Sequence, residues 1–188
     1  MLLYSVTFSS FVMPSLHPNG YTLASAGLDG MVQLWDIRKW GSNRKPSSKS
    51  SPQPLATQFV GLSISSSFFS PSGTSLVSTS FANRIDLIEQ PHCQVGKMTP
   101  TVMIKHNNKT GKWLSTFMAT WHPALDIFVV GSMEKPRRVE IFDSKGKLLR
   151  NVQGDALTSV MSRCCFHPST EKLIVVGGNS SGRVVTIR

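Results

Sequence analysis

The sequence predicts an all-β fold of the β-propeller type, because one unit recurs four times along the 188-residue chain. Each unit has a His-Pro or Ser-Pro pair, an apolar run, a turn and a second apolar run, and the pairs begin at His17, Ser70, His122 and His167. The runs after these anchors are LASAGLDGMVQLWD, LVSTSFANRIDLIE, FVVGSMEKPRRVEIFD and IVVGGNSSGRVVTIR. Self-similarity at a period of about 50 residues is typical of propeller blades. The two runs are therefore expected to be the second and third strands of each blade.

Further apolar runs fit the other two strand positions of a four-stranded blade. The innermost strands are predicted in the runs before the later anchors, LSISSSFFS, WLSTFMATW and TSVMSRCCF. The outer strands are predicted at 101–106, TVMIKH, and at 148–153, LLRNVQ. Proline directly after each anchor fits a turn, because it fixes φ and removes a backbone donor where the chain leaves the ladder.

Two segments depart from the repeat, and residues 13–188 are expected to form the partial propeller. Residues 1–12, MLLYSVTFSSFV, are an atypical N-terminal segment that fits an imperfect first strand or an alternative start site equally well. They are too short for a transmembrane span and lack the basic leader of a signal peptide. Residues 41–58, GSNRKPSSKSSPQPLATQ, are rich in Ser, Pro and basic side chains and predict a flexible loop.

Four units correspond to about four blades of a ring that we expect to have about seven. The sequence ends within the second apolar run of its fourth unit, with no outer strand after it. We therefore expect part of a longer protein or a short isoform. Two open sheet edges would make the isolated chain prone to aggregation or degradation.

The composition favours a polyanionic partner. Twenty Lys and Arg against ten Asp and Glu give a net charge of +10, which attracts nucleic acid without specifying a sequence. A basic solvated surface explains the same charge equally well. Cys93, Cys164 and Cys165 form no disulfide framework, and we expect reduced, buried thiols of an intracellular protein.

The sequence contains no pattern that predicts catalysis, a metal or a cofactor. It lacks a glycine-rich phosphate loop and a nucleophile elbow. Cys164, Cys165 and His167 do not predict a zinc site, because adjacent strand residues point to opposite faces and a fourth ligand is missing.

Propeller topology assigns the loops to two faces. Loops from outer to inner strands, and from second to third strands, emerge together on one face. There the sequence predicts a basic surface for phosphate and base contacts, made by Lys105, His106, Asn107, Asn108, Lys109, Lys112, Trp113, Arg137 and Arg138. The opposite face carries the Trp35-Asp36 pair and Arg38, a W-D-x-R pattern that is weak by itself.

The chain resembles the WD repeat-containing protein 76 family, which is related to the damaged-DNA-binding propeller subunit of a cullin-RING ubiquitin ligase. The segments that resemble it are ASAGLDGMVQLWDIR, HNNKTGKWLSTFMATWHP, PRRVEIF and GGNSSGRV. The resemblance implies a WD40-type propeller in the nucleus whose Asp36 and Arg38 dock the ligase adaptor. The segment HNNKTGKW occupies the loop with which the damaged-DNA relative wedges into lesions, but lacks that relative's aromatic wedge.

We therefore expect a non-enzymatic propeller that binds DNA or chromatin in the DNA-damage response and serves as a substrate receptor for a cullin-RING ligase. These two roles are compatible because they use different faces. The alternative is a general scaffold that binds histones or acidic peptides without direct DNA contact.

Overall fold

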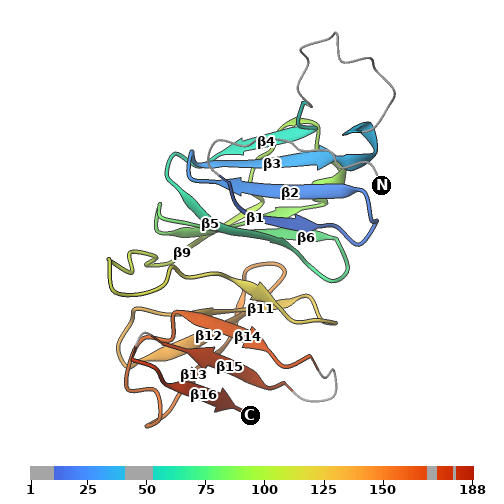
Figure 1. Ribbon diagram of the computed structural model, residues 1–188. Helices are drawn as coiled ribbons and strands as arrows, with labels where there is room; N and C mark the ends of the chain where they lie inside the picture. Colours follow the sequence, from blue (N-terminus) through green and yellow to red (C-terminus); the bar gives the residue numbers. More distant parts are fainter. Residues whose placement is uncertain (1–10, 41–52, 169–172, 180) are drawn as a thin grey trace, which may run out of the picture.

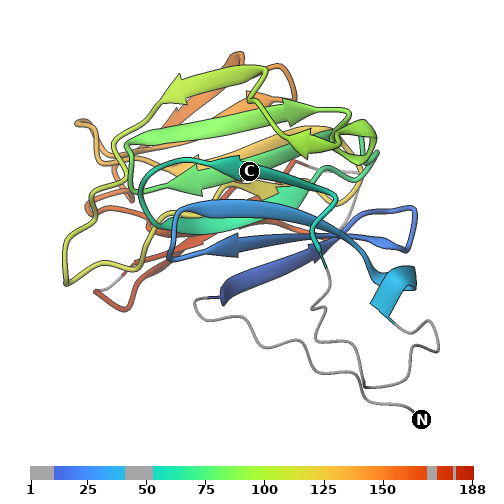
Figure 2. The same ribbon diagram turned by 90° about the horizontal axis from the view of Figure 1, so that it is seen from above.

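The computed structural model describes residues 11–40, 53–168, 173–179 and 181–188. These residues form four mainly antiparallel sheets that follow one another along the chain (Figure 1). Seen from above, the first and second sheets lie in neighbouring layers (Figure 2). The predicted all-β fold of repeated sheets is confirmed.

The strands of each sheet run from the inside of the repeat to its outside, in the order in which they occur in the chain. The first sheet contains β1 (Phe11–Leu16), β2 (Thr22–Gly27), β3 (Met31–Asp36) and β4 (Ala56–Phe59), followed by the short parallel strand β8 (Gly96–Lys97). The second contains β5 (Ile64–Phe69), β6 (Ser75–Ser80), β7 (Arg84–Glu89) and β9 (Val102–Lys105). The third contains β10 (Thr120–Trp121), β11 (Ile127–Gly131), β12 (Arg138–Asp143) and β13 (Leu148–Gln153). The fourth contains β14 (Arg163–Phe166), β15 (Val175–Gly178) and β16 (Val184–Ile187), and the 3-10 turns η1 (Ile37–Trp40) and η2 (Pro91–Cys93) follow β3 and β7.

Most predicted strands are confirmed, but the run that begins at Trp113 is not a continuous strand. Only Thr120 and Trp121 pair with β11. Before them, Ser65 Oγ donates a 2.7 Å hydrogen bond to the Phe117 carbonyl, and Ala119 N donates a 3.1 Å bond to Thr79 Oγ1. Because side chains of the second sheet satisfy this backbone, it does not join the ladder of the third.

The two segments predicted to lie outside the repeat are only partly described. Residues 1–10 and 41–52 lie outside the described residues, whereas Phe11 and Val12 belong to β1. The expected loop over 41–58 ends too late, because Ala56–Phe59 forms β4 and pairs with β3. Neither proline nor a charged side chain interrupts that segment, ATQF, which explains how it joins the sheet.

The four anchors share one backbone contact. The amides of His17, Ser70, His122 and His167 each donate a 2.8 Å hydrogen bond, to the carbonyls of Thr22, Ser75, Ile127 and Ile174. The rings of His17 and His122 accept further bonds from the turns through Nδ1. Both rings therefore have a structural role in the turns.

Three apolar clusters lie between successive sheets and hold them together. Representative members of the first cluster are Ala24, Leu34, Ile64 and Leu76. The second includes Leu87, Phe117 and Phe128, and the third includes Val129, Ile141, Met161 and Phe166. Burial of one such aliphatic or aromatic side chain stabilises a fold by about 1.5–3 kcal/mol. Each sheet is thus stabilised mainly by packing its face on its neighbour.

The loops emerge on two faces, as the topology requires. The face that we call the basic face carries the loops β6–β7, β9–β10, β11–β12 and β15–β16. The face that we call the anchor face carries the turns after the four anchors and the loop after β3. None of the helical turns in the described part of the chain is long and apolar enough to cross a membrane.

Candidate functional site

The long β9–β10 loop is fastened to the second sheet at its first residues. His106 N donates to the Asn83 carbonyl at 3.1 Å, and Asn108 N donates to Asn83 Oδ1 at 3.2 Å. The Asn108 amide Nδ2 also donates to the carbonyls of Ser80 and Arg84, at 2.9 and 3.1 Å. These bonds bring the loop and the β6–β7 turn together on the basic face.

His106 and Asn108 are therefore not part of the exposed contact surface that the sequence predicted. Their exposed fractions are 5% and 3%, and His106 Nδ1 lies 2.6 Å from Asn108 Oδ1. Burial lowers the pKa of His106, so the ring is neutral at physiological pH. The two side chains hold the loop instead of reaching a ligand.

Two of the basic side chains on this face are neutralised by buried acids on the same strands. Arg84 Nη2 donates to Asp86 Oδ2 at 3.0 Å, and Arg138 Nε donates to Glu140 Oε1 at 2.7 Å. Burial raises the pKa of Asp86, which Arg84 partly opposes. Arg138 contributes little free charge to a ligand, because its guanidinium already faces a carboxylate.

Each of these acids also faces a polar residue of the preceding sheet. Gln58 Nε2, on β4, donates to Asp86 Oδ2 at 2.5 Å, and His106 Nε2 lies 3.6 Å from Glu140 Oε2. The two acids occupy equivalent positions on β7 and β12, at the first and second junctions between sheets, whereas Gln58 lies within β4 and His106 lies just after β9. At the third junction, Val152 and Val185 both pack in the apolar cluster.

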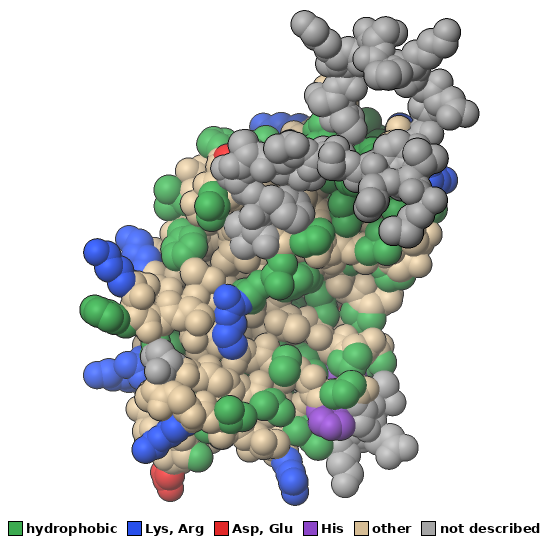
Figure 3. Space-filling view, viewed as in Figure 1, with side chains coloured by type: hydrophobic (Ala, Val, Ile, Leu, Met, Phe, Trp, Pro, Cys, Tyr) green, Lys and Arg blue, Asp and Glu red, His purple; other side chains and the backbone are tan. Residues whose placement is uncertain are grey.

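The remaining predicted residues form an exposed basic surface around an exposed indole. Lys105, Asn107, Lys109 and Lys112 are exposed, and Trp113 has an exposed fraction of 89%. Arg137 is half-buried, and its Nη1 donates to the Met133 carbonyl at 2.6 Å. Lys and Arg side chains project from the left of the molecule in Figure 3, where Figure 1 shows the β9–β10 loop. The structure thus retains a lysine-rich loop with a solvent-facing aromatic ring.

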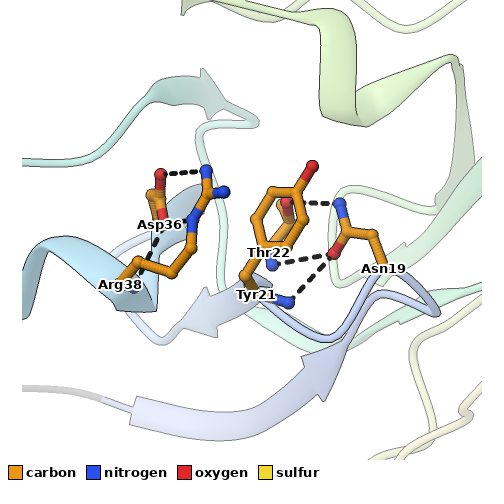
Figure 4. A network of polar contacts seen from close by, with 5 residues as sticks. All are labelled: Asn19, Tyr21, Thr22, Asp36 and Arg38. Carbon is orange, nitrogen blue, oxygen red and sulfur yellow. Dashed lines mark hydrogen bonds and ion pairs between the residues drawn. The ribbon is translucent and has the colours of Figure 1, made fainter.

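On the anchor face, Asp36 and Arg38 form a bidentate ion pair at the end of β3 (Figure 4). Arg38 Nε lies 2.9 Å from Asp36 Oδ1 and Nη2 lies 2.8 Å from Oδ2. The Arg38 hydrogen bond lowers the pKa of Asp36. The guanidinium carbon also lies 3.7 Å from the ring centroid of Tyr21, whose carbonyl accepts a 3.0 Å bond from Ile37 N.

The contribution of Tyr21 was missed in the sequence, because W-D-x-R names only residues adjacent in the chain. Strand pairing supplies the link: Thr22 opposite Asp36 brings the start of β2 beside the end of β3. The Arg38 side chain remains 61% exposed while two groups hold it.

The expected burial of all three thiols is wrong for two of them. Cys164 is buried, which raises the pKa of its thiol to about 12, whereas Cys93 and Cys165 are exposed. Alternation along β14 accounts for the difference between the adjacent pair. Among the described residues, the His, Cys, Asp and Glu side chains form no group of three or more that could hold a metal ion.

Comparison with known proteins identifies the family of this chain. The model of the WD domain, G-beta repeat, matches residues 4–36. WD repeat-containing protein 76 of Xenopus laevis is 31% identical over 182 residues, which cover 96% of this chain and 30% of the relative. The chain belongs to the WD repeat-containing protein 76 family. The predicted partial WD40 propeller is thereby confirmed.

Other relatives carry related names. WD repeat-containing protein 76 of Mus musculus is 39% identical over 125 residues, 65% of this chain and 20% of the relative. The DNA damage-binding protein CMR1 of Chaetomium globosum is 31% identical over 184 residues, 90% of this chain and 34% of the relative. The chain thus spans between a fifth and about a third of the length of these curated relatives.

Proposed function

We propose that this chain is a DNA-binding part of a WD40 propeller protein that acts in the DNA-damage response in the nucleus. The observation that carries the proposal is the exposed β9–β10 loop, in which the exposed Lys109 and Lys112 precede a solvent-facing Trp113. Lysine ammonium groups bind backbone phosphates, and an exposed indole stacks on bases. Relatives named as DNA damage-binding proteins support this class of ligand.

The test reverses charge on the basic face and compares an equal change elsewhere. The variant Lys109→Glu with Lys112→Glu is expected to lose most affinity for duplex DNA and to show a smaller salt dependence, because each phosphate contact releases counterions. Lys145→Glu with Lys147→Glu is the matched control, since both lysines are exposed between β12 and β13 on the anchor face. Both variants have the same net charge.

Equal losses in the two variants would show that net charge alone drives binding, and would reject the basic face as the site. Binding of acidic peptides by a chain that does not bind duplex DNA would favour a general scaffold for histones or acidic segments.

A second function, docking of a cullin-RING ligase adaptor, is favoured by the state of Arg38. Asp36 uses two of the five guanidinium N–H groups, and three remain for a partner. Because Asp36 and Tyr21 already fix the side chain, little rotamer entropy is lost on binding. We propose that Asp36 and Arg38 dock the adaptor and that the protein acts as a substrate receptor.

Co-purification with the adaptor tests this second function. Arg38→Ala is expected to abolish capture, whereas Lys39→Ala, which removes a neighbouring exposed cation, is expected to retain it. Retention of the adaptor by Arg38→Ala would count against the docking role.

A further inference from the structure

A hollow of about 250 Å³ opens on the basic face beside the start of the fourth sheet. Arg163 begins β14 and Gly178 ends β15, and the two residues are partners in the ladder. Arg183 reaches the hollow from the β15–β16 turn, and Ser115 reaches it from the β9–β10 loop. The hollow therefore adjoins the loop that carries Lys112 and Trp113.

The groups around the hollow are suited to an anion. The hollow is lined by the guanidinium groups of Arg163 and Arg183 and by the polar side chains of Ser115, Ser162 and Asn179. The described residues that line the hollow include no carboxylate. Arg183 Nη1 donates to Thr158 Oγ1 at 3.0 Å, which fixes the side chain without neutralising it. The planar fork of an arginine matches the oxygens of a phosphate.

Gly178 keeps the hollow open. A Cβ at this position would meet no heavy atom within 4 Å, and the residue does not have the positive φ that requires glycine. A side chain would therefore be tolerated by the backbone and would project into the space beside Arg163. The hollow is open because glycine at position 178 has no side chain, and the strand geometry does not require glycine there.

We propose that this hollow receives one backbone phosphate of the DNA that the basic face binds. The inference rests on the proposed DNA binding, and it adds a specific contact outside the lysine-rich loop. DNA is favoured over a phosphorylated peptide because Ser115 lies in the same loop as Lys112 and Trp113, so a strand stacked on the indole lies within reach of the hollow.

The decisive variant leaves the charge unchanged. Gly178→Val fills the hollow with a side chain that suits a strand. Each duplex phosphate contributes about 0.9 to the slope of log affinity against log salt. One such contact therefore raises affinity about eight-fold at 0.1 M salt relative to 1 M salt. We expect Gly178→Val to lower affinity by about that factor and to reduce the slope by about one, and Arg163→Gln to do the same.

Two controls separate this contact from general effects. Gly154→Val places the same side chain at another glycine with open space and no positive φ, and it is expected to bind like the unmodified chain. Gly178→Val combined with Arg163→Gln is expected to lose no more than either change alone, because both remove one contact. Thermal melts of each variant report folding, and Arg163→Gln decides the question if Gly178→Val melts early.

The outcomes distinguish this proposal from the one on which it rests. An unchanged salt slope in Gly178→Val and Arg163→Gln, with intact DNA binding that depends on Lys109 and Lys112, overturns the phosphate hollow alone. Absence of DNA binding by the unmodified chain overturns both. A phosphoserine peptide that binds the unmodified chain and loses affinity in Gly178→Val, while DNA binding stays constant, assigns the hollow to a peptide and overturns the DNA contact.

Discussion

Gly131 is a position at which even the smallest added side chain should be strongly destabilising. It ends β11 where the backbone of Met161 crosses it, and a Cβ there would lie 1.7 Å from the Met161 carbonyl oxygen. It would also lie 3.0 Å from Cε1 of the Phe117 ring. The obstacle is main chain that leads into the fourth sheet, so rotation of a side chain cannot relieve it.

The expected cost follows from this geometry. Overpacking in a core destabilises by about 1–3 kcal/mol, and a backbone clash belongs at the upper end, so Gly131→Ala should cost about 3 kcal/mol. For a chain of this length, one kcal/mol moves Tm by about 2–4 °C, which predicts a fall of about 6–12 °C. Thermal unfolding followed by circular dichroism measures the shift.

Gly154→Ala is the matched control, because a Cβ there meets nothing within 4 Å. Its Tm should stay within a few degrees of the unmodified chain, since an added Cβ in open space slightly restricts the unfolded chain. Equal melting temperatures for the Gly131 and Gly154 variants would refute the reasoning from close approach between sheets.

Three further predictions concern single side chains. Burial lowers the pKa of His106 below its ordinary 6.5, so the unfolded chain binds its proton more readily, and the stabilisation present above pH 6.5 is lost as pH falls toward the folded pKa. The free energy of unfolding, measured in urea, should therefore fall more between pH 7 and 5 for the unmodified chain than for His106→Gln, and parallel curves would contradict this. Iodoacetamide should label the exposed Cys93 and Cys165 in the folded chain and Cys164 only after unfolding, because burial raises the pKa of that thiol to about 12. Trp113, 89% exposed, should supply most of the fluorescence that acrylamide quenches, so Trp113→Phe should leave an emission that resists quenching.

The recurring apolar runs predicted most strands because each blade repeats the same pattern of burial. LLRNVQ coincides with β13, and β9 lies inside the predicted 101–106 segment. The Trp113 run failed because its pairing depends on Ser65 and Thr79, which lie in another sheet and are far away in the sequence. Periodicity within a segment contains no information about such partners.

The candidate site also contains some features that the sequence pattern predicted and others that depend on partners far away in the sequence. Topology correctly collected basic loops on one face, whereas the loss of His106 and Asn108 to the interior depends on hydrogen bonds with the β6–β7 turn. One pattern in the sequence does predict part of this arrangement. Arg84-Ile85-Asp86 and Arg138-Val139-Glu140 repeat a basic residue two positions before an acid on a strand, where both side chains share a face. That spacing predicts the ion pairs that neutralise these two arginines.

The short strand β8 gives the first sheet a protection that the other sheets lack among the described residues. Gly96 N and Met98 N donate to the carbonyls of Leu55 and Thr57, at 2.8 and 2.7 Å, along the outer side of β4. An unpaired outer strand is a template for foreign strands, and β8 occupies that template with a segment of the next blade. The outer strand of the third sheet has no such cover among the described residues, and it exposes Leu148 and Leu149. Intermolecular β-pairing of this chain should therefore involve uncovered strands such as β13 more readily than the paired part of β4.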